Sequence, residues 1–182
     1  INLSPNAPAL YDSIGRLNWR KNNGAFNNPM ALLLKTYENK AEWYNGNFVI
    51  GYKILPSLTA RINAGYNMQR IKETSLTPIA SQDPANSPTG SASFGSNYIN
   101  NWIIEPQLEY STRPFKEVSF TAQIGNSFQY KQTHSTITDA DGYTSDALIR
   151  SIVGSAYSQT TINSLEYRYS GLFGRLSMNW RQ

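Results

Sequence analysis

The stretch FVIGYKILPSLTARINAGYNM, residues 48–68, decides the fold because apolar side chains recur in it at every second position. A period of two places alternate side chains on opposite faces of a β-strand. We therefore predict two strands joined by a tight turn at Leu55-Pro56-Ser57. One face of this hairpin is apolar and uncharged, and it holds Phe48, Ile50, Tyr52, Ile54, Leu58, Ala60, Ile62, Ala64, Tyr66 and Met68. The other face is too polar to pack into a second core.

The composition of the 182-residue chain is that of one domain rich in aromatic residues and poor in charge. Aromatic residues make up 13% of the chain and charged residues 15%, against about 25% charged residues in an average domain. The net charge of +4 is spread along the chain, so no nucleic-acid partner is expected. Cysteine is absent, which excludes disulfides and thiol chemistry within these residues. The first residue is Ile1 and no signal peptide is visible, so we interpret the sequence as an excerpt of a longer chain.

Alternation predicts an all-β antiparallel up-and-down meander of about five long strands, with long loops on one side. The strands are expected at residues 42–54, 58–71, 98–110, 118–131 and 165–180. They form a hairpin within 40–72, a second within 98–131 with a turn at 112–116, and a last strand within 165–182. Residues 1–39 are expected to be an irregular loop segment that contains a tight turn at 12–15 and one helical turn at 30–34.

The two long connections are predicted from their composition. Residues 73–97 carry Pro78, Pro84 and Pro88 among small polar residues, which is typical of a long loop. Residues 132–164 are expected to form a second loop with a short helix at 146–153, capped by Ser145 and stopped by Gly154.

The later strands repeat the apolar row of the first hairpin. These rows contain Trp102, Ile104, Pro106, Leu108, Tyr110, Val118, Phe120, Ala122, Ile124, Phe128, Tyr130, Leu172, Leu176, Met178 and Trp180. Asn126 is the polar exception in the fourth strand, and Pro106 predicts a bulge or a missing ladder bond. Tyr167 and Tyr169 have the opposite parity, so they face the polar side unless a bulge near Gly171 shifts them.

Strand length and loop asymmetry favour the wall of a large transmembrane β-barrel. Each predicted strand supplies the 9 to 11 residues, roughly, that a membrane-spanning strand needs. Aromatic residues stand at both ends of the apolar rows, as in the girdles of outer-membrane barrels. They are Tyr52, Tyr110 and Phe115 beside the short turns and Tyr44, Trp102 and Tyr130 towards the long loops.

Two other architectures fit part of the pattern. A soluble antiparallel β-sandwich that binds carbohydrate also has alternating strands, and its apolar rows would pack about 10 Å apart. A small adhesin-like barrel without transport is the third hypothesis.

Several phrases of the sequence resemble SusC/RagA-like TonB-dependent outer-membrane transporters. In the first segment these are Pro5-Asn6-Ala7-Pro8, Tyr11-Asp12-Ser13-Ile14-Gly15, Leu17-Asn18-Trp19 and Asn28-Pro29. Later they are Ala147-Leu148-Ile149-Arg150-Ser151-Ile152 and, most specifically, YRYSGLFGRLSMNW at residues 167–180. The resemblance covers most of the chain and is weakest at residues 73–97.

The resemblance implies a piece of the barrel wall, of about 22 strands in such transporters, located in the bacterial outer membrane. Such proteins import oligosaccharides or peptides, are powered by TonB and are capped by a SusD-like surface lipoprotein. The resemblance therefore implies that lipoprotein, TonB, outer-membrane lipid and an oligosaccharide or peptide substrate as partners. No plug domain, no TonB-contacting segment and too few strands to close such a barrel are found in these residues.

No catalytic centre, metal site or cofactor is expected, so the chain is not predicted to be an enzyme. His134 is the sole histidine, and Asp139-Ala140-Asp141-Gly142 lacks the twelfth-position glutamate of a calcium loop and is interpreted as a polar turn. Glu105 and Glu109 share one strand face, where a lumen-wall pair balanced by Arg61 is favoured over a glycosidase pair. Stacking and amide side chains near the long loops are the candidate ligand contacts: Tyr98, Asn101, Tyr143, Tyr157, Tyr167 and Tyr169.

Overall fold

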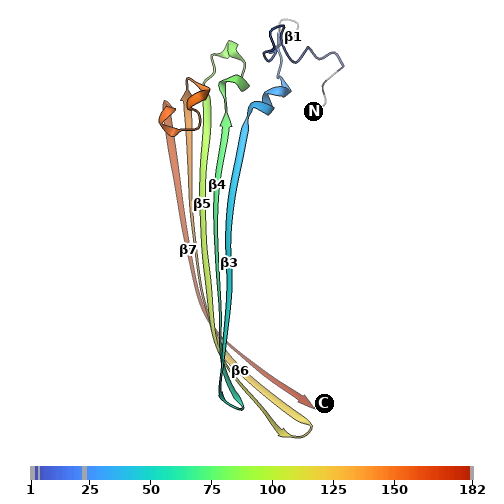
Figure 1. The fold of residues 1–182 in the computed structure, drawn as a ribbon, viewed down its shortest axis with the longest axis vertical. Helices are drawn as coiled ribbons and strands as arrows, with labels where there is room; N and C mark the ends of the chain where they lie inside the picture. Colours follow the sequence, from blue (N-terminus) through green and yellow to red (C-terminus); the bar gives the residue numbers. More distant parts are fainter. Residues whose placement is uncertain (1–2, 4, 22–23, 181–182) are drawn as a thin grey trace. The chain divides into compact units, whose positions relative to one another are not determined.

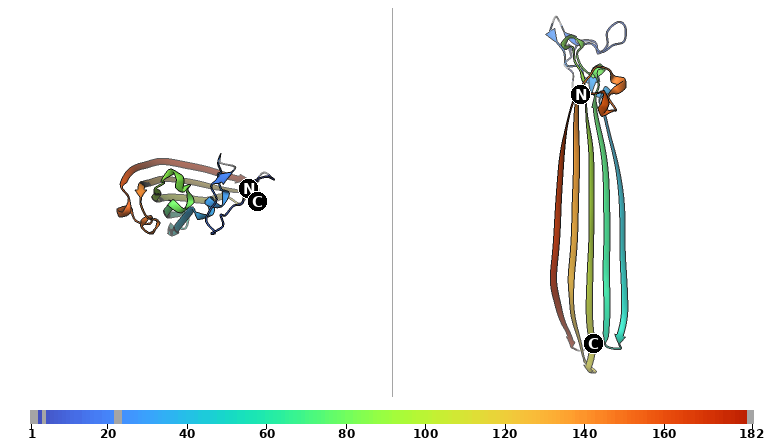
Figure 2. Two further views of the ribbon diagram at one scale, coloured as in Figure 1. Left: turned by 90° about the horizontal axis from the view of Figure 1, so that it is seen from above. Right: turned by 90° about the vertical axis from the view of Figure 1, so that its left-hand side faces the viewer.

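The computed structural model describes residue 3, residues 5–21 and residues 24–180. Its main feature is one antiparallel sheet of five long strands in the order β3-β4-β5-β6-β7, so each strand lies beside its neighbours in sequence (Figure 1). The strands are β3 Thr36–Leu55, β4 Leu58–Thr77, β5 Gly90–Phe115, β6 Val118–Tyr143 and β7 Tyr157–Trp180. The right-hand view of Figure 2 shows them side by side. The predicted five-stranded up-and-down meander is confirmed.

The connections alternate between short and long, as predicted. Pro56 and Ser57 join β3 to β4, and Lys116 and Glu117 join β5 to β6. The long connections span residues 78–89 and 144–156 and contain four short 3-10 helices. These are η2 Ile79–Ser81, η3 Pro84–Asn86, η4 Asp146–Leu148 and η5 Ile152–Gly154. No helix in the described part of the chain is long and apolar enough to span a bilayer.

The strands extend well beyond their predicted bounds, with 20 to 26 residues each. The predicted loop at 73–97 is wrong at both ends, because β4 continues to Thr77 and β5 begins at Gly90. The predicted loop at 132–164 is likewise too long, and the DADG sequence ends β6 instead of forming a turn. The predicted turn at 112–116 is part of β5 apart from Lys116. The predicted helix at 146–153 is replaced by η4 and η5, although the Ser145 side chain accepts a bond from Ala147 N, as expected of a cap.

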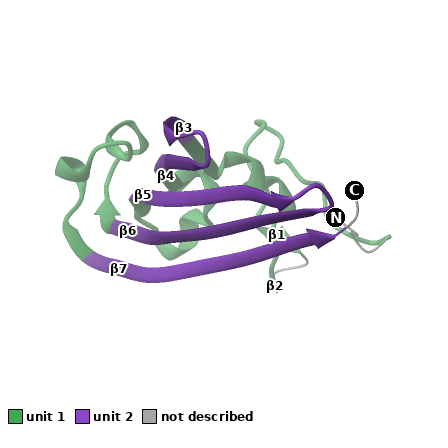
Figure 3. Cartoon of the chain, turned by 90° about the horizontal axis from the view of Figure 1, so that it is seen from below, with its two compact units in different colours: residues 1–40, 72–96, 136–161 green, residues 41–71, 97–135, 162–182 purple. Residues whose placement is uncertain are grey.

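The chain divides into two compact units, coloured green and purple in Figure 3. Unit 1 consists of residues 1–40, 72–96 and 136–161 and holds the long connections. Unit 2 consists of residues 41–71, 97–135 and 162–182 and holds both short turns.

Unit 1 contains a small hydrophobic core. Leu76, Ala92 and Ala140 come from β4, β5 and β6, and Tyr143 and Ile149 pack with them. Tyr143 is fully buried, and its hydroxyl donates a 3.0 Å hydrogen bond to Ser151 O. Burial raises the pKa of this phenol above its ordinary value. The core therefore anchors connection 144–156 on the sheet of unit 1.

The side-chain amide of Asn28 and a tight turn at Gly15 fix the conformation of the first segment of unit 1. Asn28 is buried; its Nδ2 donates to Leu10 O (2.6 Å) and Asn18 O (3.0 Å), and its Oδ1 caps the 3-10 helix η1, Pro29–Leu34. Gly15 adopts φ +79°, which favours glycine, and its N donates to Asp12 O. The predicted turn at 12–15 and helical turn at 30–34 are thus both present. Two short strands, β1 Arg20–Lys21 and β2 Gly24–Ala25, pair antiparallel after this turn.

Candidate functional site

Unit 2 presents two chemically different sheet faces, and cross-strand contacts show which residues share a face. On the apolar face, the rings of Trp102 in β5 and Tyr130 in β6 stack with centroids 5.9 Å apart. Asn126, the polar exception in its row, lies on the same face, where Ser170 Oγ of β7 donates to its Oδ1 at 3.5 Å. The even-numbered rows of β5, β6 and β7 therefore join into one face.

The opposite face is polar and is built from odd-numbered residues. Gln123 Nε2 donates to Gln107 Oε1 at 2.7 Å between β6 and β5. A Cβ placed on Gly65 would lie 3.0 Å from Ile103 Cγ2 and 3.2 Å from Asn47 Oδ1, so β3, β4 and β5 contribute to the same face. The strict alternation in the sequence therefore becomes a real separation of apolar and polar surfaces.

The apolar face of unit 2 remains exposed. Ile62 is 45% exposed, Leu108 is 39% exposed and Leu176 is 76% exposed, although they lie in three different strands. The sandwich alternative needs a second sheet against such a face. Apart from the five-stranded sheet, the described residues form only the two-stranded β1-β2 sheet, which belongs to unit 1, and one isolated bridge. Nothing in unit 2 itself therefore covers the apolar rows.

The predicted lumen charges lie on the polar face. Ser111 N of β5 donates to Ser57 O at 2.8 Å, so these two residues lie opposite each other. In an antiparallel pair, Arg61, four residues after Ser57, then lies opposite Gln107, four residues before Ser111. Glu105 and Glu109 flank Gln107 two residues away, a diagonal separation of about 7–8 Å from Arg61. No ion pair found among the described residues joins Arg61 to either glutamate. Charge balance between them stays a prediction.

Strand β7 places Tyr167 and Tyr169 on the polar side. The guanidinium of Arg168 lies 5.6 Å from the ring centre of Tyr130 on the apolar face, so residues 167 and 169 point the other way. The Tyr169 hydroxyl lies over Gly171, and Phe173 Cζ would be 2.5 Å from a Cβ on Gly125 of the polar face. Even-numbered residues face the apolar side and odd-numbered residues face the polar side from residue 168 to residue 173. No bulge at Gly171 is therefore needed to explain why Tyr167 and Tyr169 face the polar side.

The other predicted ligand residues do not form one site. The guanidinium carbon of Arg70 lies 5.6 Å from the ring centre of Tyr98. Tyr98 has an even number and so lies on the apolar face of β5, whereas Asn101 has an odd number and lies on the polar face. In unit 1, Tyr143 is buried in the core, and the exposed Tyr157 donates to Gln159 Oε1 at 3.5 Å. Ligand contact by Tyr98, Asn101, Tyr143, Tyr157, Tyr167 and Tyr169 remains a prediction. In the described residues, no three His, Asp or Glu side chains gather as a metal site would require.

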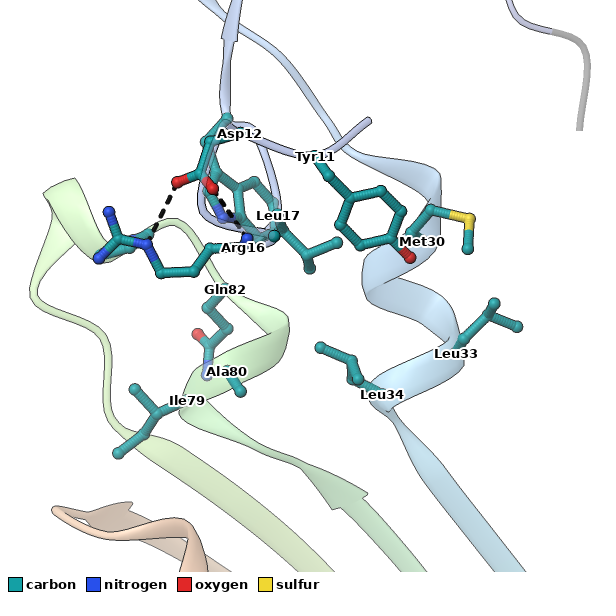
Figure 4. Close-up of a pocket in the computed structure, with 13 residues that line it drawn as sticks. Tyr11, Asp12, Arg16, Leu17, Met30, Leu33, Leu34, Ile79, Ala80 and Gln82 are labelled. Atoms are coloured by element: carbon teal, nitrogen blue, oxygen red, sulfur yellow. Dashed lines mark hydrogen bonds and ion pairs between the residues drawn. The ribbon is translucent and has the colours of Figure 1, made fainter. Parts of the chain in front are cut away.

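Unit 1 contains a pocket that sequence reasoning missed. Its volume is about 660 Å³, and it opens between the turn at 12–15, η1 and η2 (Figure 4). Its walls are mainly apolar, and they comprise Tyr11, Leu17, Trp19, Met30, Leu33, Leu34, Ile79, Ala80 and Pro84. Asp12, Gly15, Arg16 and Gln82 complete the lining. The one signal in the sequence was the run of three leucines, 32–34, inside a predicted loop.

Two walls of this pocket, the turn at 12–15 and η2, are held by side-chain hydrogen bonds. Asp12 Oδ1 accepts from Ile14 N (3.0 Å) and Arg16 N (2.8 Å), and its Oδ2 pairs with Arg16 Nε at 3.2 Å. These bonds, foremost the one from Arg16 N, lower the pKa of Asp12 below its ordinary value. The η2 wall is fixed from connection 144–156, since the Asp146 carboxylate accepts from Ile79 N at 2.7 Å and Ala80 N at 3.1 Å.

Two ion pairs also join distant segments of unit 1. Arg20 Nη1 lies 2.9 Å from Asp83 Oδ2, and Arg150 Nη2 lies 2.8 Å from Glu38 Oε1. The bond from Arg150 lowers the pKa of Glu38, and the same contact raises the pKa of Arg150. Connection 144–156 is therefore tied to η2 by Asp146 and to the start of β3 by Arg150.

Among the comparisons with known proteins, only the search of solved structures found similar chains. No protein-family model and no curated protein matches the chain. The chain is similar to a chain in the structure of the RagAB peptide transporter, with a TM-score of 0.78 and 15% identity over 95% of this chain. Chains of the RagAB peptide importer in its "closed-closed" and "open-open" states give TM-scores of 0.73 and 0.75 at 14% identity. This chain spans 20% of the length of those chains, and the likeness shows that it shares their fold over one-fifth of their length.

Proposed function

We propose that this chain is part of the barrel wall of a SusC/RagA-like TonB-dependent transporter in the bacterial outer membrane. The observation that carries the proposal is the exposed apolar face of unit 2, which runs across all five strands opposite a polar face. Monomeric water-soluble proteins rarely expose so continuous an apolar surface. Hydrocarbon on one side and a water-filled lumen on the other match both faces, because barrel strands alternate in this way.

The segments within unit 2 then form the membrane-spanning part, and the connections in unit 1 lie outside the hydrocarbon. The stacked Trp102 and Tyr130 rings, with Tyr98 on the same parity, serve as an interfacial girdle, since Trp and Tyr favour that depth. Arg61, Glu105 and Glu109 line the lumen in this arrangement. A SusD-like lipoprotein and TonB act as partners through the whole transporter.

Peptide is the substrate that we favour over oligosaccharide. The support is that the similar structures are described as a peptide transporter and a peptide importer. The mostly apolar pocket of unit 1 also suits amino-acid side chains better than it suits sugar hydroxyls, which need many polar partners when buried.

The experiment is an uptake assay in cells that carry or lack the gene for the full-length protein. Fluorescent peptides and fluorescent oligosaccharides are supplied in parallel, in cells with and without TonB. The proposal expects gene-dependent peptide uptake that disappears without TonB. Oligosaccharide uptake alone would correct the substrate, and TonB-independent or absent uptake of both would refute the transporter.

A further inference from the structure

We infer that the pocket of unit 1 binds a peptide through one large apolar side chain, of the size of Leu, Met or Phe. The inference rests on the proposed function only for the source of the peptide. It adds a defined subsite, which lies between the turn at 12–15, η1 and η2.

The walls favour an apolar occupant. Leu17, Leu33, Leu34 and Ile79 supply aliphatic surface, and Tyr11 supplies a ring beside Met30 (Figure 4). A volume of about 660 Å³ lies within the range of small-ligand pockets, roughly 300–1,000 Å³, and exceeds what one side chain needs. The pocket therefore accepts a large side chain together with adjoining backbone.

The polar atoms of the pocket select peptide over a purely hydrocarbon ligand. Gln82 Nε2 donates to Thr89 O at 2.8 Å and to Pro78 O at 3.4 Å, which fixes the amide. Among the described residues no donor reaches Gln82 Oε1, and no partner reaches the Tyr11 hydroxyl. A peptide supplies an N–H for the oxygen and a carbonyl for the hydroxyl, whereas an acyl chain supplies neither.

The same atoms disfavour a sugar. A buried sugar ring brings several hydroxyl groups, and each loses its water partners on entry. Asp12 cannot serve them fully, because it already accepts from Ile14 N, Arg16 N and Arg16 Nε. Besides Asp12, only Tyr11, Arg16, Trp19 and Gln82 among the described residues bring polar side-chain groups to the lining, and aliphatic side chains form most of the rest.

The pocket can be altered without touching the core of unit 1. Ala80 is exposed, and only its backbone N–H contacts Asp146, so Ala80→Trp fills the space and keeps that bond. Leu33 lines the pocket and is 72% exposed, while its neighbour Leu32 is 60% exposed and does not line it. Leu33→Ala and Leu32→Ala therefore form a matched pair of test and control.

The experiment measures peptide binding to the full-length protein in lipid nanodiscs by fluorescence anisotropy. The probes are a fluorescein-labelled Gly-Ser-Phe-Ser-Gly peptide, its Gly-Ser-Ser-Ser-Gly analogue, and labelled maltohexaose. We expect the Phe peptide alone to bind. Ala80→Trp should weaken it at least about tenfold, Leu33→Ala about fivefold from lost apolar contact, and Leu32→Ala not at all.

Equal binding of both peptides, maltohexaose binding that Ala80→Trp abolishes, or equal effects of the two leucine variants would overturn the inference. Absence of any peptide binding would also overturn it. If TonB-dependent peptide uptake persists in that case, the proposed transporter stands and only this subsite fails. If uptake fails but the Phe peptide binds as expected, the subsite stands without the transporter.

Discussion

Units 1 and 2 share the same five strands but treat apolar side chains in opposite ways. In the described residues, all six buried hydrophobic side chains belong to unit 1: Ala31, Leu76, Ala92, Ala140, Tyr143 and Ile149. Unit 2 has more large apolar side chains, and those of its rows remain partly or largely exposed. Unit 1 therefore builds its own core under a folded connection, whereas the apolar rows of unit 2 stay exposed. The proposed barrel wall explains this difference, because it places water around unit 1 and hydrocarbon against the apolar face of unit 2.

The largest expected effect comes from removing the core of unit 1. Tyr143→Ala deletes a fully buried ring, and such truncations cost about 3–5 kcal/mol. Hydrogen exchange should show lost protection at Leu76, Ala92 and Ala140, while strands of unit 2 keep theirs. Tyr143→Phe is the control, since it removes only the bond to Ser151 O, worth about 1 kcal/mol. Equal deprotection of both units would contradict the separation between them.

A charge on the apolar face of unit 2 should have the next largest effect. Leu108→Arg places a guanidinium in hydrocarbon, at a cost of about 2–4 kcal/mol near the bilayer centre. The neighbouring Gln107→Arg points to the polar face and should change stability by no more than about 0.5 kcal/mol. Urea-driven unfolding from lipid vesicles measures both variants of the full-length protein. Equal losses of unfolding free energy in the two variants would contradict the assignment of Leu108 and Gln107 to opposite faces.

The close approach between β6 and β7 gives a third prediction. A Cβ on Gly125 would lie 2.5 Å from Phe173 Cζ and 2.9 Å from Pro106 O, so Gly125→Ala should cost about 1–3 kcal/mol through overpacking. Phe173→Leu should recover part of this loss, because it withdraws one of the two obstructing groups. Thermal unfolding of the single and double variants tests the coupling, and purely additive effects would contradict it.

The extent of the strands shows where sequence reasoning fails. In unit 2 large apolar residues alternate, so residues 48–68 predicted both the turn at Pro56-Ser57 and the two faces. In unit 1 the buried hydrophobic positions of β5 and β6 are Ala92, Ala140 and Tyr143 at the end of β6, and the two alanines are too small to produce a visible apolar row. The prolines at 78, 84 and 88 then made the whole of 73–97 resemble a loop, although they lie only in the actual connection.

The pocket was beyond prediction for a different reason. Its walls come from three segments, and their placement depends on hydrogen bonds between residues far apart in the sequence, such as those that Ile79 N and Ala80 N donate to Asp146. The Ser145 cap was predictable because its partner is two residues away. The partner of Asp146 lies 67 residues away, and no local pattern encodes such a bond.

Weakening the hydrogen bonds between Asp146 and the backbone of η2 should have a smaller effect on stability, confined to unit 1. Asp146→Asn replaces one carboxylate oxygen by an NH2 group and removes the charge, so one of the two backbone amides loses its acceptor and the other keeps only a neutral one. We expect a local loss of about 1–2 kcal/mol, seen as faster hydrogen exchange at Ile79 and Ala80. Ser145→Ala serves as a neighbouring control that should spare those two amides. Unchanged exchange in Asp146→Asn would show that the bond does not hold η2.

The smallest effect should be pH-dependent and belongs to the pair of Glu38 and Arg150. The folded pKa of Glu38 lies below its ordinary value of 4.5, so the pair stabilises the fold above that value. This contribution is lost as the pH falls through the lowered pKa. Protection factors in connection 144–156 should drop between pH 6 and pH 3 more in the parent protein than in Glu38→Gln. An identical drop in both proteins would show that the pair of Glu38 and Arg150 does not stabilise connection 144–156.

The central claim is that hydrocarbon contacts the apolar face of unit 2, and lipid quenching measures this most directly. Because these residues contain no cysteine, Ile62→Cys and Asn63→Cys each give this chain one thiol for a bimane label. In vesicles of brominated lipid, the full-length protein should show strong quenching at position 62 and weak quenching at position 63. An unquenched label at 62, or equal quenching at both positions, would contradict the account.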